Sequence, residues 1–274
     1  MTRMPTFFIS HGGGPWPWLE GDFRRQFDRV ERSLKEIVAS LPAKPQAILV
    51  ISGHWEEDRF TVMSAERPGM LYDYGGFPRH TYEIRYGAPG APQVAKRVKA
   101  LIEAAGLPAA LDPERGFDHG TFVPLAVMYP DADVPVLQLS LRRGYDPAEH
   151  LALGRALAPL RDEGVLIVGS GLSFHNLRAF GPVAQGPSQA FDRWLDESLG
   201  ARPDERVRRL VHWERAPAAR LAHPREDHLI PLLAAVGAAE QEPATRVYHE
   251  RDFMGGVTAS SYRFGGSDAT ERTP

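Results

Sequence analysis

The chain has 274 residues, of which 43% are hydrophobic and 24% charged, and its formal net charge is −3. These values are ordinary for a globular protein, and the lack of a basic excess argues against nucleic acid as a partner. Cysteine is absent, which excludes disulfides, thiolate metal sites and cysteine nucleophiles. A metal would therefore need imidazole or carboxylate ligands. No apolar run approaches the ~20 residues of a membrane span, and no signal sequence is evident, so we expect a cytoplasmic protein with no membrane partner.

Strand-like and helix-like patterns alternate from the N-terminus onward. A strand at 6–10 is followed by an amphipathic helix over 20–41 and by strands at 47–53 and 61–65. Residues 66–90 are rich in Gly, Pro and Tyr, which predicts a long irregular segment of the kind that tends to be functional. The later predicted elements are a helix at 92–105, a short strand near Ala109, a strand at 134–140, a helix at 147–161, a strand at 165–171, helices around 187–198, 203–213 and 227–237, and closing strands at 245–251 and 260–264.

This alternation predicts a single α/β domain. Its central sheet should be mostly parallel or mixed, with helices on both faces, because the strands read as nearly continuous apolar runs. No linker or internal repeat divides the chain, so we assign residues 1–265 to the domain and 266–274 to a flexible C-terminal tail. In such sheets, ligands collect beyond the carboxyl ends of the strands.

Three histidines lie at or just past predicted strand ends. His11 and His54 end the first two strands, and His175 comes shortly after the strand at 165–171. Imidazole is the commonest metal ligand among side chains, so we expect the three to converge on one site. Each of them, taken alone, is equally well explained as a packed or turn residue. The glycines after His11 would let the backbone pass close to a ligand.

Two further histidines are candidates for chemistry. His119 lies in a polar segment at 116–120, where an imidazole could serve as a general acid or base or simply cap a loop. His223 and His228 are spaced one residue too widely to share a helical face, and His228, at a helix start, is the better candidate ligand. The spacing around Ser170 does not match a nucleophile elbow, which argues against a serine hydrolase. The remaining histidines are expected at the surface or in loops: His80, His150, His212 and His249.

Nine short sequence fragments occur in an order that is typical of one protein family. Each fragment alone is too short to indicate that family. The fragments are Ser10–Gly13, Ser52–Trp55, Asp73–Pro78, Tyr86–Gly90, Gly116–Gly120, Met128–Asp133, Gly169–Gly171, His175–Arg178 and Asp227–Leu232. Together they resemble the class III extradiol ring-cleavage dioxygenases of the LigB type, in particular the DOPA 4,5-dioxygenase-like branch.

The resemblance implies a role for each histidine. His11, His54 and His228 match metal ligands, and His175 matches a further histidine that is either a ligand or an acid/base catalyst. His119 matches the substrate-facing acid/base residue. Most non-haem Fe(II) oxygenases use two histidines and one carboxylate, whereas the third matching position here is a histidine. Because three imidazoles are uncharged, a metal ion bound by them keeps its full positive charge. Such a site should favour binding of a negatively charged catecholate.

The resemblance also implies the cofactor and the partners. We expect Fe(II) for activity and Zn as a metal that copurifies, with a small aromatic diol (DOPA-like or another catechol) and O₂ as substrates. We allow for a homo-oligomer. Two alternatives remain: a Zn-dependent hydrolase that uses the same histidines, and a non-catalytic binding protein on this fold. The aromatic residues of 66–90 would line the substrate pocket or pack an ordinary loop: Tyr72, Tyr74, Phe77 and Tyr82.

Overall fold

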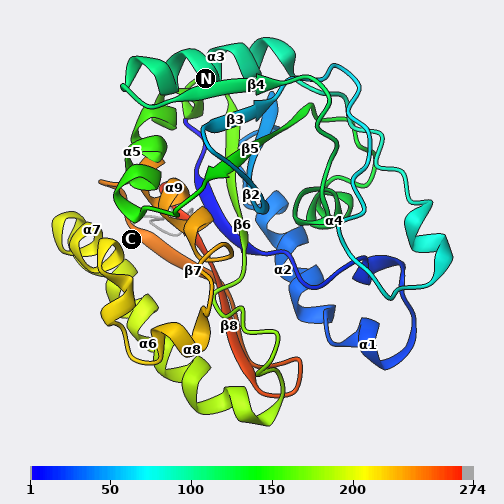
Figure 1. The fold of residues 1–274 in the computed structure, drawn as a ribbon, viewed down its shortest axis with the longest axis vertical. Coiled ribbons are helices and arrows are strands. Elements are labelled where there is room, and N and C mark those ends of the chain that lie inside the picture. Colours follow the sequence, from blue (N-terminus) through cyan, green and yellow to red (C-terminus); the bar gives the residue numbers. More distant parts are fainter. Residues whose placement is uncertain (1, 267–274) are drawn as a thin grey trace, which may run out of the picture.

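The computed structural model describes residues 2–266 and has one eight-stranded sheet at its centre (Figure 1). The strand order is β4-β3-β5-β2-β6-β1-β8-β7, and the neighbours from β5 to β1 run parallel. The strands are β1 Thr6–Ser10, β2 Ala47–Glu57, β3 Phe60–Met63, β4 Ala109–Asp112, β5 Val136–Arg142, β6 Val165–Gly171, β7 Ala244–Phe253 and β8 Val257–Phe264. Apart from Gly266, the predicted tail lies outside the described residues.

Helices cover both faces of the sheet, as predicted for this α/β domain. They are α1 Gly21–Arg25, α2 Asp28–Ala39, α3 Pro92–Ala104, α4 His119–Met128, α5 Pro147–Leu157, α6 Gln185–Leu199, α7 Pro203–Val211, α8 Ala219–Ala222 and α9 Ile230–Ala238. In Figure 1, α5 and α9 lie to the left of the central strands, and α2 and α4 lie to the right. Within residues 2–266, no helix is long and apolar enough to cross a bilayer.

The helix predicted over 20–41 is interrupted, and the interruption serves packing. Gln26 and Phe27 separate α1 from α2. The Phe27 ring is fully buried and stacks on Trp16, with 5.2 Å between ring centroids. The Phe27 ring therefore packs into the core at the point where the helix is interrupted.

Helix α4 has no counterpart among the predicted elements. Helix α4 begins at His119, in the segment read as a polar loop, and contains Pro124. It is buried on nearly all sides, so it lacks the apolar stripe by which a surface helix is recognised. Asp118 caps it, because its carboxylate accepts a hydrogen bond from the Thr121 amide. His119 thus stands in the first turn of a helix and not in a loop.

The prediction that His150 is a surface or loop residue is wrong. His150 is fully buried in α5, where Nδ1 donates to the Asp146 carbonyl and Nε2 accepts from the Arg142 amide. Burial lowers the pKa of His150 to about 4. Below about pH 6.5, the ordinary pKa of histidine, His150 therefore binds a proton in the unfolded chain but stays neutral in the folded chain.

We expect the free energy of unfolding to fall between pH 6.5 and pH 4 in part because of His150. Urea unfolding at several pH values should show this decline in the wild type. The decline should be smaller in His150→Gln, which keeps polar atoms but does not titrate. An identical pH dependence in the two proteins would contradict this account.

Candidate metal centre

His11 is held by the turn that follows β1. Its amide donates to the Gly171 carbonyl at 3.2 Å, which extends the pairing of β1 with β6. Its carbonyl accepts from the Trp16 indole at 3.0 Å. Gly12 follows with a φ of 86°, and a Cβ there would overlap the Trp16 ring. The backbone at His11 is therefore fixed on one side by β6 and on the other by Trp16, five residues later.

His54 lies within β2, and an irregularity in that strand displaces it from regular pairing. The register of β2 against β5 shifts between Ile51 and Glu56, and the pairing with β6 stops at Ser52. Bulges of this kind re-aim side chains near functional sites. His54 was predicted at a strand end, and the structure places it in the part of β2 that has left the β6 ladder.

His228 reaches the centre because two glycines of β6 let its segment approach closely. A Cβ on Gly171 would lie 2.1 Å from the His228 carbonyl oxygen, and one on Gly169 would lie 2.3 Å from that of Pro231. The Leu172 amide donates to the same His228 carbonyl at 3.1 Å. Residues Gly169–Gly171 thus serve backbone packing, and α9 itself begins two residues after His228, at Ile230.

Gly171→Ala should therefore damage the site without touching a histidine. The added methyl would push the His228 backbone outward, and overpacking of this kind costs about 1–3 kcal/mol of stability. We expect a lower melting temperature together with weaker binding of divalent metal, measured by calorimetry. Gly186→Ala is a suitable control because a Cβ there has open space. Unchanged metal affinity in a destabilised Gly171→Ala protein would contradict the positioning role.

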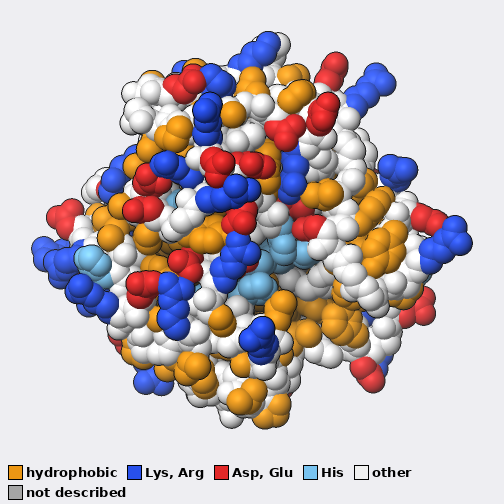
Figure 2. All heavy atoms as spheres, viewed as in Figure 1, with side chains coloured by type: hydrophobic (Ala, Val, Ile, Leu, Met, Phe, Trp, Pro, Cys, Tyr) orange, Lys and Arg blue, Asp and Glu red, His pale blue; other side chains and the backbone are white. Residues whose placement is uncertain are grey.

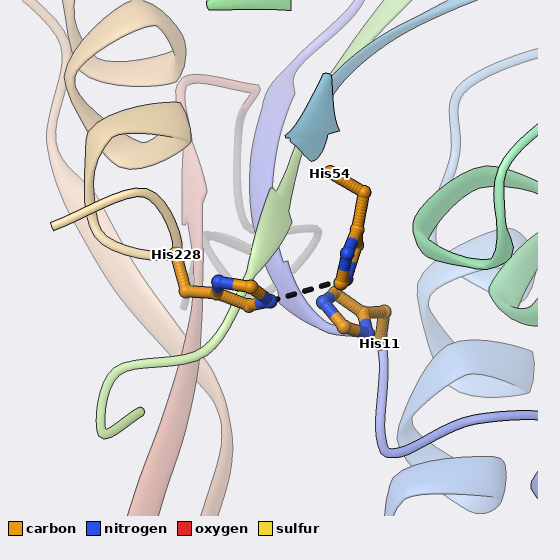
Figure 3. A group of neighbouring side chains, drawn as sticks. All are labelled: His11, His54 and His228. Carbon is orange, nitrogen blue, oxygen red and sulfur yellow. Dashed lines mark hydrogen bonds between the residues drawn. The ribbon is translucent and has the colours of Figure 1, made fainter. Parts of the chain in front are cut away.

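The rings of His11, His54 and His228 converge from three separate elements (Figure 3). Their centroids are 5.0 Å apart for His11 and His54, 5.3 Å for His11 and His228, and 4.6 Å for His54 and His228. One nitrogen from each ring lies within 4.8 Å of the other two. The Nε2 atoms of His54 and His228 are 3.1 Å apart. This is the arrangement of a three-histidine site.

The electrostatics of these rings suit a bound cation. His11 and His228 are each 2% exposed, and both ring nitrogens of His11 are buried without a hydrogen-bond partner. Burial, with smaller contributions from the neighbouring imidazoles, lowers the pKa of His11 and His228 and brings that of His54 to about 3. All three are neutral near pH 7, which is the form that binds metal. The unsatisfied nitrogens therefore fit a non-haem metal ion.

Two carboxylates flank the histidines, and sequence reasoning did not assign either of them a role. Asp73 Oδ1 accepts from the His119 amide at 3.0 Å and from its Nδ1 at 2.7 Å, while Oδ2 lies 3.4 Å from His54 Nδ1. Asp227 Oδ1 lies 3.1 Å from His228 Nδ1 and 3.8 Å from His175 Nδ1. Burial raises the pKa of Asp73, but the hydrogen bonds from His119 and the electrostatic influence of His119 and His54 together outweigh burial and bring the value to about 2.

The outer partner of His54 is not the carboxylate nearest to it in sequence. Glu56, two residues after His54, pairs with Arg225 and accepts from the Tyr145 hydroxyl. Asp73, which is distant in sequence, takes that position. Metal-bound histidines usually place the second ring nitrogen against such a carboxylate. The adjacency of Asp227 to His228 and the fragment that contains Asp73 were the available signals.

His119 and His175 border the same cluster. The His119 ring centroid is 3.9 Å from that of His54, and the His175 ring stacks on His228 at 3.4 Å. His175 lies past the end of β6, with its amide bound to the Ala222 carbonyl. His223 is separate: it is fully buried and its Nε2 contacts the Ser173 carbonyl. The structure thus gathers His11, His54, His119, His175 and His228 in one place.

The five histidines line a cavity of about 480 Å³. Gly12–Gly14 line it as well, as expected for glycines beside a ligand site, and so do Tyr74 and Phe77 from the long segment after β3. Tyr72 packs against Tyr74 and Phe122 instead. In Figure 2 the histidine side chains are visible from outside near the middle of this face, beside a group of hydrophobic side chains. The centre is thus open to a small molecule.

An α/β sheet with a buried histidine cluster at the carboxyl ends of its strands defines a metal-dependent enzyme site. Residues 5–265 match the family model described as the catalytic LigB subunit of aromatic ring-opening dioxygenase. The chain is 40% identical over 263 residues to a 4,5-DOPA dioxygenase extradiol of Beta vulgaris, covering 94% of this chain and 96% of that protein. Identity to the protein of the same description from Escherichia coli K12 is 37% over 270 residues, with 96% of both covered. The fold matches the crystal structure of an Escherichia coli K12 protein with a TM-score of 0.77 at 34% identity, covering 96% of this chain and all of the other.

The chain belongs to the LigB family of class III extradiol dioxygenases. It is an aromatic ring-opening extradiol dioxygenase, an oxidoreductase with a buried histidine cluster for a metal.

Proposed function

We propose that this enzyme cleaves a catechol with Fe(II), that His11, His54 and His228 are the metal ligands, and that His119 is the acid/base residue. The observation that carries the ligand proposal is the buried trio of neutral imidazoles, in which both nitrogens of His11 lack a hydrogen-bond partner. When bound, Fe(II) would supply the redox chemistry that O₂ activation requires, whereas Zn is redox-silent. Zn would be expected to bind the same imidazoles.

The proton-transfer role of His119 is supported by its hydrogen bond to Asp73. Because Nδ1 donates to Asp73 Oδ1, Nε2 carries the lone pair and is the atom that would accept a proton from a catechol hydroxyl. The ionised carboxylate would then stabilise the imidazolium until the proton is returned. His175, stacked on His228 and facing Asp227, is proposed as the residue that supports the ligand side of the cluster.

For the substrate, we propose a ring-substituted catechol, and DOPA, the compound in the relatives' names, is the reference against which other catechols are compared. O₂ is the second substrate. The side walls of the cavity, which include Tyr74 and Phe77, suit an aromatic ring.

The test is to load the metal-free protein with Fe(II) under anaerobic conditions and to measure O₂ uptake and a yellow semialdehyde product with several catechols. We expect turnover with Fe(II) and none with Zn, at equal metal occupancy. Absence of turnover of every catechol by the iron form would overturn the proposed function, and oxygen-independent hydrolysis by the Zn form would replace it with metal-assisted hydrolysis.

A further inference from the structure

Most of the side chains that line the cavity beside the histidines are apolar. Its hydrophobic lining comes from four separate segments: the junction of α1 and α2, the segment after β3, the loop after β6, and the turn between β7 and β8. The side chains concerned are Phe27, Phe77, Leu172, Phe180, Phe253 and Met254. A catechol bound at the histidines would therefore extend its ring substituent among hydrocarbon and aromatic side chains.

No lysine or arginine lines this cavity among the residues that the structure describes. Besides the histidines, its ionisable groups are Asp73, Asp227 and Tyr74. The Tyr74 hydroxyl donates to the Thr81 carbonyl. The cavity walls formed by the described residues therefore present two carboxyl groups to a substrate and no lysine or arginine side chain.

Two arginines line an adjoining cavity, which shares His175, Leu177 and Asp227 with the first. One of them, Arg225, is already paired with Glu56 and lies over the Tyr145 ring. The other, Arg178, is exposed to solvent and does not line the first cavity. A carboxylate carried by the ring substituent of a substrate in the first cavity would lose water and meet no lysine or arginine side chain of residues 2–266. Burying an unpaired charge is costly, whereas an alkyl or aryl group gains from the same surroundings.

We propose that the ring substituent of this enzyme's substrate is uncharged and apolar, and that the cavity selects against catechols that carry a carboxylate. This inference rests on the proposed cleavage of catechols and specifies which class of them the enzyme takes. The preference follows from the apolar residues of the walls, among which, within the described part of the chain, no lysine or arginine side chain is available to pair with a carboxylate. The expected discrimination is about tenfold or more in kcat/KM, as for other sites that must leave a charged group unpaired.

The test compares three catechols of similar size: propylcatechol, which is neutral, dihydroxyphenylpropionate, which is anionic, and dopamine, which is cationic. Turnover by the Fe(II) form and calorimetric binding to the Zn form are both measured. We expect propylcatechol to have the highest kcat/KM with the Fe(II) form and the highest affinity for the Zn form. Equal or better use of the anion would overturn the proposal, and a preference for dopamine would replace it with pairing to Asp227. If none of the three is bound or turned over, the proposed function itself fails, and the substrate proposal falls with it.

Leu177→Arg tests the cause of the preference. Leu177 lines the cavity and its side chain is 73% exposed, so an arginine there can be accommodated without repacking the core. We expect the ratio of kcat/KM for the anion to that for propylcatechol to rise about tenfold. Val183→Arg adds the same charge at a residue 68% exposed that does not line the cavity, and should leave the ratio unchanged. If the wild type prefers the anion and loses that preference in Arg178→Gln, a cation of the adjoining cavity governs selection and the proposal is wrong.

Discussion

His11→Ala is expected to abolish both metal binding and ring cleavage. Neither ring nitrogen of His11 has a hydrogen-bond partner, and one of them lies within 4.8 Å of a nitrogen of His54 and of His228. Metal binding therefore explains why an imidazole is buried at this position. Loss of an outer hydrogen-bond partner of a metal ligand costs roughly 10–100-fold in affinity or activity, and loss of a ligand should cost more. Metal content after dialysis, measured by elemental analysis, and O₂ uptake with a catechol are the two readouts.

The matched control for this prediction is His212→Ala, which removes an exposed imidazole outside the cluster. It should retain wild-type metal content and activity. Thermal unfolding of the metal-free proteins separates loss of the site from loss of the fold. Because the buried nitrogens of His11 are unsatisfied, metal-free His11→Ala should be close to the wild type in stability. A His11→Ala protein that keeps stoichiometric metal would refute the ligand assignment.

His119→Gln is expected to lower kcat by about 10²–10⁴-fold while leaving metal content unchanged. Glutamine retains an amide that can reach Asp73 but cannot accept and return a proton. The metal-ligand proposal places His119 outside the trio, so elemental analysis should find the same metal occupancy as in the wild type. Parallel loss of metal and of kcat would instead make His119 a ligand.

Asp73→Asn should have a smaller effect, of roughly 10–100-fold on kcat, because Asp73 acts through His119. Asparagine can still accept a hydrogen bond from the His119 amide, but it no longer offers an ionised partner to the imidazolium. At equal metal occupancy, the double variant with His119→Gln should be no slower than His119→Gln alone, since Asp73 and His119 are proposed to act as one unit in proton transfer. Additive losses would show that Asp73 contributes independently.

Local sequence patterns predicted most of the scaffold. The apolar runs before His11, His54 and His175 are buried strands, and their alternation with helices correctly indicated one α/β domain. The pattern failed where burial is nearly complete, as in α4, and where a single ring interrupts a helix, as at Phe27. Hydrophobic periodicity arises from the contrast between a solvent-exposed face and a buried face. An element that is buried on all sides therefore shows no helical periodicity in its sequence.

The sequence by itself determined the type of chemistry, because a chain with no cysteine and with histidines after its strands can offer only imidazole and carboxylate ligands. Its ordered fragments also indicated the family. Only the tertiary structure decided which side chains meet. Asp73 reaches His119 and His54, Asp227 reaches His228, and two glycines of β6 admit the His228 segment. These contacts join residues far apart in the chain, and their distances depend on strand register and backbone approach, which local sequence patterns do not encode.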